Sequence, residues 1–389
     1  MTADQSAAAE AEPADAERHA SWLELFFDLL FVAIVAQLAH GLVGHATVGR
    51  VLAVAGLFCP LWWFWVSFSY FSDAEERDTP AHRIGVLAMM AGLVVCGGGI
   101  AGALHGDPAL FALGSGLARL TRTVQWVLTV RSRVGRRTAL RTAAPYLASG
   151  TLWLVSAATP TPACYLLWSA ALLLEVVPAL LAATATTGPA RDAIDGPHLV
   201  ERFGLFVIIA LGEGIAQIVA ALGVAGHAHA PEVLTALAAF VLLCAVWWLY
   251  FDFGNAAALT MLQARSDEVW PLIRNGFAFG HVLLVGGIVA LSAGVGTAVA
   301  AAQDGSADPD AVRLVCGSLL VYLLNNSAVG LLLRLTSAAG TAAWLLPDVA
   351  VLAGVWAAAD RLAPGWAFLL IAVVLLLTSL PSILRRLRG

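Results

Sequence analysis

The chain has 389 residues, of which 60% are hydrophobic and only 12% are charged, and its mean hydropathy is +0.84. Soluble domains carry about 25% charged residues, so this composition predicts a polytopic membrane protein. The net charge of −5, with arginines spread over short loops, argues against a nucleic-acid partner. The chain contains no lysine, which excludes chemistry that needs a lysine amine.

The chain begins with residues 1–20, which are rich in Ala, Glu and Asp and lack the basic start and apolar core of a signal peptide. We expect a disordered cytoplasmic tail here. Beyond it, apolar windows broken by Pro, Gly or charge predict about twelve membrane-spanning helices. The windows are 22–42, 51–71, 84–104, 109–130, 145–159, 163–187, 200–222, 233–254, 276–300, 311–334, 342–359 and 365–384. The fifth window is shorter than a full crossing requires.

The first window carries two acids four residues apart, Glu24 and Asp28, which an α-helix places on one face. Glu24 follows Ser21 by three positions, the S-x-x-E pattern of a capping box at a helix N-terminus. Asp28 lies one turn deeper, where a charged acid costs about 2.5–3.5 kcal/mol near the bilayer centre. We expect Glu24 to cap the helix and Asp28 to be neutral, paired or exposed to water.

The fourth window holds two arginines within an apolar segment, Arg119 and Arg122, at i and i+3. We favour pairing with a buried acid, for which Asp28, Glu213 and Glu175 of the sixth window are available. An anion-binding role is the alternative.

The seventh window contains a deeper acid, Glu213, which lies roughly 18 Å along a helix from Glu201 and therefore near the middle of the membrane. Gly212 and Gly214 flank it and allow a backbone or a small ligand to approach, and Gln217 shares its helical face. We select Glu213 as the principal ion- or substrate-binding residue. The alternative is an interhelical hydrogen bond made by a protonated acid.

The ninth window contains His281, which can serve either as a proton relay or as a hydrogen-bonded core histidine. His227 and His229 form an H-x-H in a loop without a third ligand nearby. The five cysteines stand singly in apolar segments, where buried thiols are the simplest interpretation. We therefore predict no cofactor and no metal site.

An internal repeat relates the two parts of the chain. Residues 59–63 (CPLWW) match residues 244–248 (CAVWW), and the same offset of 185 positions places Asp28 opposite Glu213. Six helices separate equivalent helices, so two six-helix halves would lie in the same orientation, as in parallel-repeat transporters. The predicted units are the first half at 21–187, a linker at 188–199 and the second half at 200–389.

The distribution of arginine predicts the orientation in the membrane. With a cytoplasmic N-terminus, most arginines fall in cytoplasmic loops, while the outer loops hold only Arg50, Arg313 and Arg361. We expect a multi-pass protein of the cell (plasma) membrane with both termini in the cytoplasm.

Two acidic segments, LELFFDLLFV at 23–32 and ERFGLFVIIALGE at 201–213, resemble the hallmark segments of the bacterial low temperature requirement A family. The resemblance covers the whole chain in length and order of spans, with Gly214 standing where a serine is expected. It implies an integral membrane protein associated by name with growth in the cold, and it assigns no molecular activity. The residues that match the motif are Glu24, Asp28, Glu201, Arg202, Phe203, Gly204 and Glu213.

Two hypotheses of function follow from the buried acids. A secondary transporter would use Asp28 and Glu213 to bind a proton or cation that drives a small solute across the lipid bilayer. A non-transporting scaffold or stress-response component would use the same acids to hold helices together. An enzyme is not expected, because we recognise no Ser–His–acid set, HExxH motif or catalytic aspartate pair.

Overall fold

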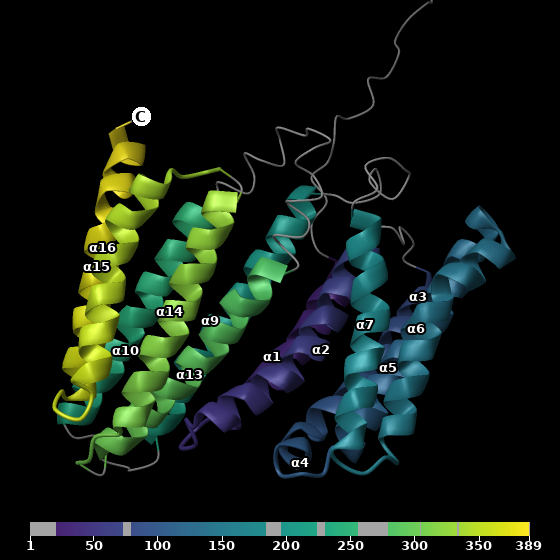
Figure 1. Ribbon diagram of the computed structural model, residues 1–389, viewed down its shortest axis with the longest axis horizontal. Coiled ribbons are helices and arrows are strands. Elements are labelled where there is room, and N and C mark those ends of the chain that lie inside the picture. Colours follow the sequence, from purple (N-terminus) through teal and green to yellow (C-terminus); the bar gives the residue numbers. More distant parts are fainter. Residues whose placement is uncertain are drawn as a thin grey trace, which may run out of the picture.

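Long apolar helices form the part of the chain that the computed structural model describes, which comprises residues 21–72, 79–183, 196–223, 230–255, 279–303, 305–332 and 334–388. These helices lie roughly side by side, and the described ranges contain no strand (Figure 1). Nine helical segments among them are long and apolar enough to cross a membrane. The predicted all-α transmembrane bundle is therefore confirmed.

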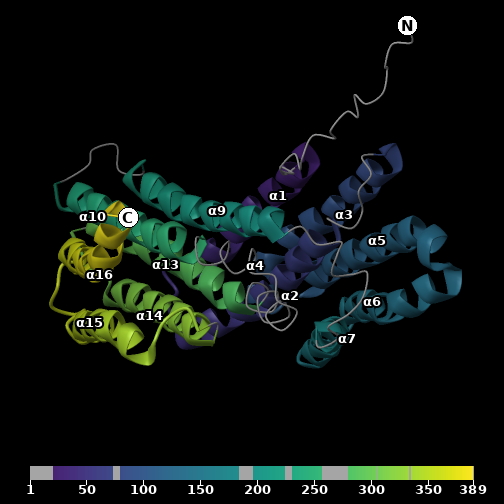
Figure 2. The same ribbon diagram turned by 90° about the horizontal axis from the view of Figure 1, so that it is seen from above.

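The earlier helices of the chain are α1 (Trp22–His40), α2 (Val48–Ser72), α3 (Pro80–Gly98), α4 (Ile100–Leu104), α5 (Ala109–Val134), α6 (Arg136–Ser156) and α7 (Ala163–Ala183). The later ones are α9 (Gly196–Gly223), α10 (Ala230–Leu249), the π-helix η1 (Tyr250–Asn255), α13 (His281–Gln303), α14 (Pro309–Leu332), α15 (Ala338–Ala357) and α16 (Pro364–Arg388). In both ribbon views α9–α16 gather on one side and α3–α7 on the other, with α1 and α2 near the middle (Figures 1 and 2). The equivalence of the two halves stays a prediction, and residues 1–20 and most of the linker lie outside the described residues.

The predicted first residue of the fifth window was wrong. Helix α6 begins at Arg136 instead of residue 145 and has 21 residues, with Pro145 inside it. The charges of Arg136, Arg137 and Arg141 hid this first part of the helix from a search for apolar residues. Since a crossing needs about 20 residues, α6 has sufficient length.

The helices of the third and fourth predicted windows cross closely, at glycines. A Cβ atom built on Gly99, between α3 and α4, would lie 2.2 Å from the backbone nitrogen of Phe111 in α5. A Cβ on Gly114 of α5 would lie 2.1 Å from the backbone nitrogen of Cys96 in α3. Only glycine fits where two helix backbones approach this closely. The neighbouring Gly98 is not part of this contact, because its Cβ would meet nothing within 4 Å.

An aromatic layer fills the space between α1, α2 and α9. The ring of Phe31 lies 5.9 Å from that of Phe206, and Trp65 makes edge contacts with Phe203 at 5.0 Å and Phe206 at 4.5 Å. All four of these side chains are buried, and so is Trp62 of the CPLWW segment. In the matching CAVWW segment, Trp247 and Trp248 are 45% and 41% exposed, so the two similar segments have different surroundings.

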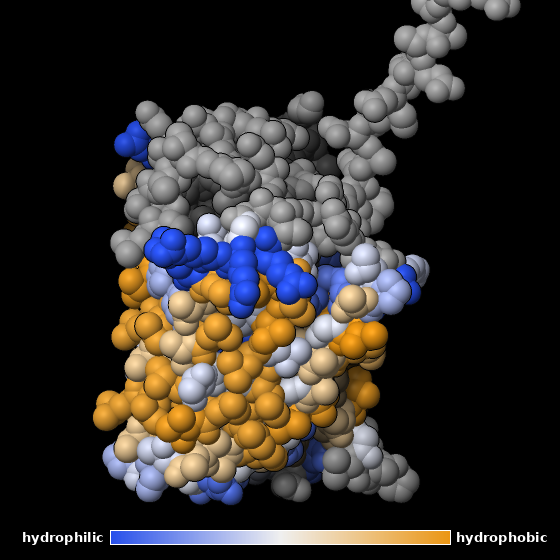
Figure 3. All heavy atoms as spheres, turned by 90° about the vertical axis from the view of Figure 1, so that its right-hand side faces the viewer, coloured by the Kyte–Doolittle hydropathy of each residue, from blue (hydrophilic) through white to orange (hydrophobic). Residues whose placement is uncertain are grey.

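The outer surface carries the apolar band expected of a protein embedded in lipid. Figure 3 shows a broad hydrophobic region between hydrophilic residues at its upper and lower edges, on the face formed by the helices at the right of Figure 1. Val124 and Leu128 of α5 are about half exposed, at 51% and 53%. Because water would not favour so much exposed apolar surface, this face contacts lipid.

The exposed Cys59 and Cys244 correct the expectation that every thiol is buried.

Candidate functional site

The first turn of α1 contains the predicted capping box. The backbone nitrogen of Ser21 donates to Oε2 of Glu24 at 2.8 Å, and the backbone nitrogen of Glu24 donates to Oγ of Ser21 at 3.3 Å. The prediction that Glu24 caps this helix is confirmed. The same carboxylate also approaches α9, where Nε2 of His198 lies 3.7 Å from Oε2 and Nη1 of Arg202 lies 3.8 Å from Oε1.

One turn deeper in α1, Asp28 pairs with an arginine of α9, a helix that is distant in the sequence but adjacent in space. Nη2 of Arg202 donates to Oδ1 of Asp28 at 2.9 Å, and the indole Nε1 of Trp65 in α2 donates to the same oxygen at 2.8 Å. Arg202 is fully buried and Asp28 is 3% exposed. A buried charge requires this kind of compensation in the apolar interior of a membrane protein. We call Glu24, Asp28, Trp65, His198 and Arg202 the acid–arginine cluster.

Aromatic rings enclose the guanidinium group of Arg202. Its Cζ lies 5.6 Å from the ring centre of Trp65 and 5.5 Å from that of Phe68. Both distances fall within the range of cation–π attraction, which strengthens as water is removed. The two rings therefore help to stabilise the charged guanidinium group of Arg202 in the apolar interior of the protein.

The contacts of the cluster show that α1 and α9 run in the same direction. Asp28 meets Arg202, and Phe31 meets Phe206 further along both helices. The first helix of each predicted half thus lies in parallel beside the other.

Glu213 occupies a separate polar position on α9. It is 6% exposed, and Nε2 of Gln217 donates to its Oε1 at 2.6 Å. It follows Arg202 by 11 positions, or about 16 Å along the helix, so the structure does not bring it together with Asp28. The flanking Gly214 faces α10 and α13, since its Cβ would lie 2.9 Å from Leu243 and 3.0 Å from Ser292. The missing side chain at Gly214 thus allows α10 and α13 to pack closely against α9.

The two arginines of α5 belong to another cluster. Nε of Arg119 donates to Oε1 of Glu175 in α7 at 2.9 Å, and Nη2 donates to the carbonyl of Pro60 at 2.9 Å. Oγ of Ser149 donates to the same oxygen of Glu175 at 2.5 Å. The favoured pairing of Arg119 with a buried acid is confirmed, with Glu175 as the partner. Arg122 is 9% exposed, and its Cζ lies 5.7 Å from the ring centre of Phe68.

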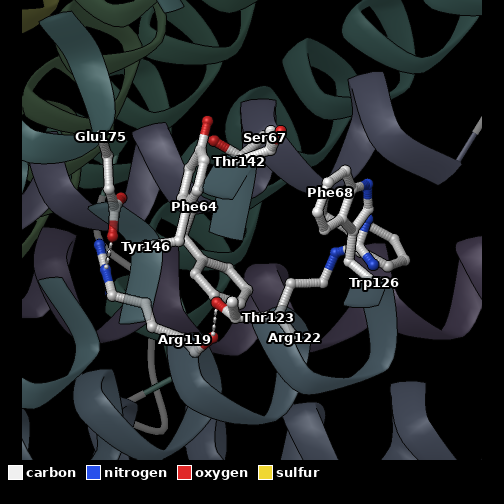
Figure 4. A pocket seen from close by; sticks show the side chains of 10 residues that line it. All are labelled: Phe64, Ser67, Phe68, Arg119, Arg122, Thr123, Trp126, Thr142, Tyr146 and Glu175. Carbon is white, nitrogen blue, oxygen red and sulfur yellow. Dashed lines mark hydrogen bonds and ion pairs between the residues drawn. The ribbon is translucent and has the colours of Figure 1, made fainter. Parts of the chain in front are cut away.

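A cavity of about 80 Å³ lies beside these arginines, and we call it the arginine pocket. Arg119 extends toward Glu175, and Arg122 extends on the other side, toward Phe68 and Trp126 (Figure 4). The pocket is lined by Phe64, Ser67, Phe68, Arg119, Arg122, Thr123, Trp126, Thr142, Tyr146 and Glu175.

His281 lies at the start of α13, beside the aromatic layer. Its Nε2 is 3.0 Å from the hydroxyl of Tyr250, and its ring makes an edge contact with Phe203 at 4.9 Å. Two further residues of the family motif differ in burial, since Gly204 is buried and Glu201 is exposed.

The other two histidines considered as ligands, His227 and His229, lie outside the described residues. Within the described ranges, no three His, Cys, Asp or Glu side chains are grouped to hold a metal ion.

Sequence reasoning missed two members of the acid–arginine cluster. His198 precedes Arg202 by four positions, so the helical spacing of the two was available as a signal for one common face. Trp65 stands in an aromatic stretch of α2, and nothing in that stretch distinguishes the indole that donates to Asp28.

The family model described as bacterial low temperature requirement A protein (LtrA) matches residues 19–380. The chain belongs to this family. It is also similar to the Rhizobium meliloti (strain 1021) protein named Uncharacterized protein RA0937, with 29% identity over 310 residues and 72% of each chain covered. No solved structure matches the chain. The acid–arginine cluster and Glu213 are thus features of an LtrA family membrane protein, and both motif segments lie within the matched residues.

Proposed function

We propose that this LtrA family protein is a secondary transporter, in which the Asp28–Arg202 pair couples a proton or cation to the movement of a small solute. The observation that carries the proposal is the position of this pair, because it joins α1 to α9, the first helices of the two predicted halves. Charged groups inside a membrane are costly, and in transporters they line ion and substrate pathways between repeated halves.

Protonation of Asp28 is the step through which a proton would act. It removes the negative charge that faces Arg202, and with it most of the attraction between α1 and α9 at this point. Oδ2 of Asp28 is buried and has no hydrogen-bond partner among the described residues, so it is the oxygen that can take the proton. Loss of the pair would allow the two halves to move relative to each other.

Glu213 supplies a second acid, on α9, the helix that carries Arg202. It lies about 16 Å further along α9 than Arg202, at the position equivalent to Asp28 under the 185-residue offset. The amide of Gln217 holds one of its oxygens. In this proposal Asp28 and Glu213 are two successive binding positions for the coupling ion, and no enzymatic step is involved.

Purified protein in liposomes that contain a pH-sensitive dye tests this function. With an inward proton gradient, a solute from a panel of amino acids, sugars, organic anions and inorganic cations should accelerate internal acidification. Asp28→Asn and Glu213→Gln should abolish that acceleration, whereas Asp310→Asn, at an exposed position, should preserve it. Solute-dependent acidification that survives both buried changes would contradict the mechanism.

A non-transporting scaffold or stress-response role is the second candidate, favoured by the intramolecular partners of the buried acids. Glu175 is held by Arg119 and Ser149, and Glu213 by Gln217. A scaffold predicts that Glu213→Gln leaves growth in the cold intact, while a change that misplaces helices, such as Gly114→Ala, does not.

The proposal includes a plasma-membrane location with both termini in the cytoplasm. It is supported by the exposed Arg131, Arg136, Arg137 and Arg141 where α5 meets α6, on the side predicted to be cytoplasmic. A fluorescent protein fused to the C-terminus should be bright in intact cells, and a periplasmic phosphatase at the same place should be inactive. The opposite pair of results would reverse the orientation.

A further inference from the structure

We propose that the hairpin formed by α5 and α6 binds the phosphate group of an anionic phospholipid. Four exposed arginines carry the proposal, and we call them the hairpin arginines: Arg131, Arg136, Arg137 and Arg141. The surface lies on other helices than the acid–arginine cluster. It does not rest on the transport mechanism proposed above, because lipid binding can be measured without any movement of solute.

A single residue connects the two helices and brings the hairpin arginines together. Helix α5 ends at Val134, α6 begins at Arg136, and Gly135 between them has a φ of 81°, a conformation that favours glycine. Arg131 lies four positions before this glycine and Arg141 six positions after it, which is about 6 Å and 9 Å of helix. Since α5 and α6 pack against each other, all four side chains lie at the same end of the pair.

The hairpin arginines have no counter-charge in their part of the fold. In the described ranges, none of the four side chains makes an ion pair or a hydrogen bond. The sequence from 108 to 174 contains no acid. The next acid along the chain, Glu175, is buried and accepts from Arg119 and Ser149. The four positive charges are therefore available to an anion from outside the chain.

Helix stability does not explain why these arginines are grouped. Arg136 and Arg137 stand in the first turn of α6, where the helix dipole disfavours cations, and Gly135 provides no side-chain cap. Arg137 and Arg141 are four positions apart, so their like charges repel each other on one helical face. An anion bound among these side chains would offset both unfavourable effects.

Apolar surface that faces lipid adjoins the hairpin arginines. Leu140, between Arg137 and Arg141 in α6, is 43% exposed, and Leu128, three positions before Arg131 in α5, is 53% exposed. Figure 3 shows hydrophilic residues along the upper edge of the hydrophobic face to which these helices belong. A ligand at this edge meets positive charge and apolar surface together. A phospholipid with a negative headgroup has both complements, whereas a soluble anion has only one.

Aromatic residues indicate the depth of the hairpin arginines in the membrane. Trp126 of α5 precedes Arg131 by five positions, Tyr146 of α6 follows Arg141 by five positions, and both rings are partly exposed. Trp and Tyr gather where the acyl chains meet the headgroups. Five residues of helix span about 7.5 Å, so the arginines reach from these rings into the headgroup layer. A guanidinium group at that level can donate two hydrogen bonds to one phosphate.

Native mass spectrometry of the purified, delipidated protein with defined lipids tests the proposal. From an equal mixture of phosphatidylglycerol and phosphatidylcholine with the same acyl chains, the native protein should retain mainly phosphatidylglycerol. Replacing one hairpin arginine by glutamine should weaken that binding up to about fivefold, and replacing all four should weaken it at least about tenfold. Replacing all four by lysine should preserve part of the affinity, because the charge remains.

Arg361 offers a matched control at the connection between α15 and α16. It is exposed, and its side chain makes no ion pair with the described residues. Arg361→Gln removes one positive charge at a distant connection, so it should retain phosphatidylglycerol as the native protein does. A loss equal to that of Arg137→Gln would show that total charge matters instead of the hairpin, and would overturn the proposal.

Two further measurements separate a lipid from a soluble anion and from misfolding. Millimolar inorganic phosphate should not displace phosphatidylglycerol, because it has no acyl chains; displacement at concentrations similar to the lipid would overturn the lipid assignment. Equal retention of the two lipids by the native protein, or a preference that the fourfold glutamine variant keeps, also overturns the proposal. Thermal unfolding of that variant in phosphatidylcholine nanodiscs should match the native protein, and the single glutamine variants decide the test if it does not.

Discussion

Arg202 of α9 and Asp28 of α1 form an ion pair at 2.9 Å although 174 positions separate them in the chain. Both side chains are buried, and Trp65 donates to the same carboxylate oxygen that Arg202 contacts. This contact ties together the two motif segments of an LtrA family protein. The stability of the helix packing should therefore depend on it more than on any exposed ion pair.

Removal of the acid should be strongly destabilising. Asp28→Ala leaves the buried guanidinium of Arg202 without its nearest carboxylate, and breaking a buried pair in this way costs about 3–5 kcal/mol. Unfolding of the purified protein in detergent, followed by circular dichroism, measures the loss. Asp310→Ala, which removes an exposed partner of Arg313, should leave unfolding unchanged. Replacing both members, as Asp28→Leu with Arg202→Met, should recover much of the loss, and strict additivity of the two single changes would argue against a direct pair.

The hydrogen bond from Trp65 can be isolated with a matched tryptophan. Trp65→Phe removes an indole N–H that donates to a carboxylate, an interaction worth about 1.5–3 kcal/mol. Trp153 is equally buried, and its Nε1 has no hydrogen-bond partner among the described residues. Trp153→Phe removes the same volume without this bond, so Trp65→Phe should lower the unfolding temperature further. Equal shifts would show that only ring size matters.

The helix cap of α1 should make a modest, separable contribution. Ser21→Ala removes the oxygen that accepts from the backbone of Glu24 and should cost about 1 kcal/mol. Ser21→Asp keeps an acceptor at this place and should remain within a few tenths of a kcal/mol of the native protein. Hydrogen exchange of the first amides of α1 would locate the effect, and unchanged exchange in Ser21→Ala would contradict the capping role.

Two adjacent glycines should respond in opposite ways to alanine. Gly99→Ala places a methyl group 2.2 Å from the backbone of Phe111 and should destabilise by about 1–3 kcal/mol, because α5 must move. Gly98→Ala meets open space within a helix and should be neutral or stabilising by up to about 1 kcal/mol. Thermal unfolding of the two variants compares them directly. A loss of similar size at both positions would show that the close crossing is not the cause.

Local features of the site could be predicted from the sequence, and long-range partners could not. The capping box at Ser21 and Glu24 follows from spacing along one helix, so the pattern was sufficient. The pairing of Arg119 with Glu175 was one of three options, because charge alone does not say which helices adjoin. For Asp28, the arginines of α5 were one option among several, and Arg202 is the partner because α1 packs against α9.

The presence of most helices could be predicted from the sequence, but the residues at which they begin and end could be predicted less well. Apolar windows located the crossings, because lipid requires satisfied backbone groups and apolar surface over about 20 residues. Helix α6 extended into a run of arginines that hydropathy could not recognise as helical. Trp62 and Trp247, which the predicted repeat makes equivalent, differ in burial because the surroundings of a side chain depend on neighbouring helices that a match of two short segments does not specify.

The separation of Asp28 and Arg202 along the chain also sets an order of events during biosynthesis. At about 5–20 residues per second, a ribosome needs about 9–35 s to make the 174 positions between them. Helix α1 must therefore enter the membrane, or wait at its surface, before its cation exists. A nascent chain interrupted before α9 would carry in its first helix an acid without its arginine partner, which is costly inside a membrane.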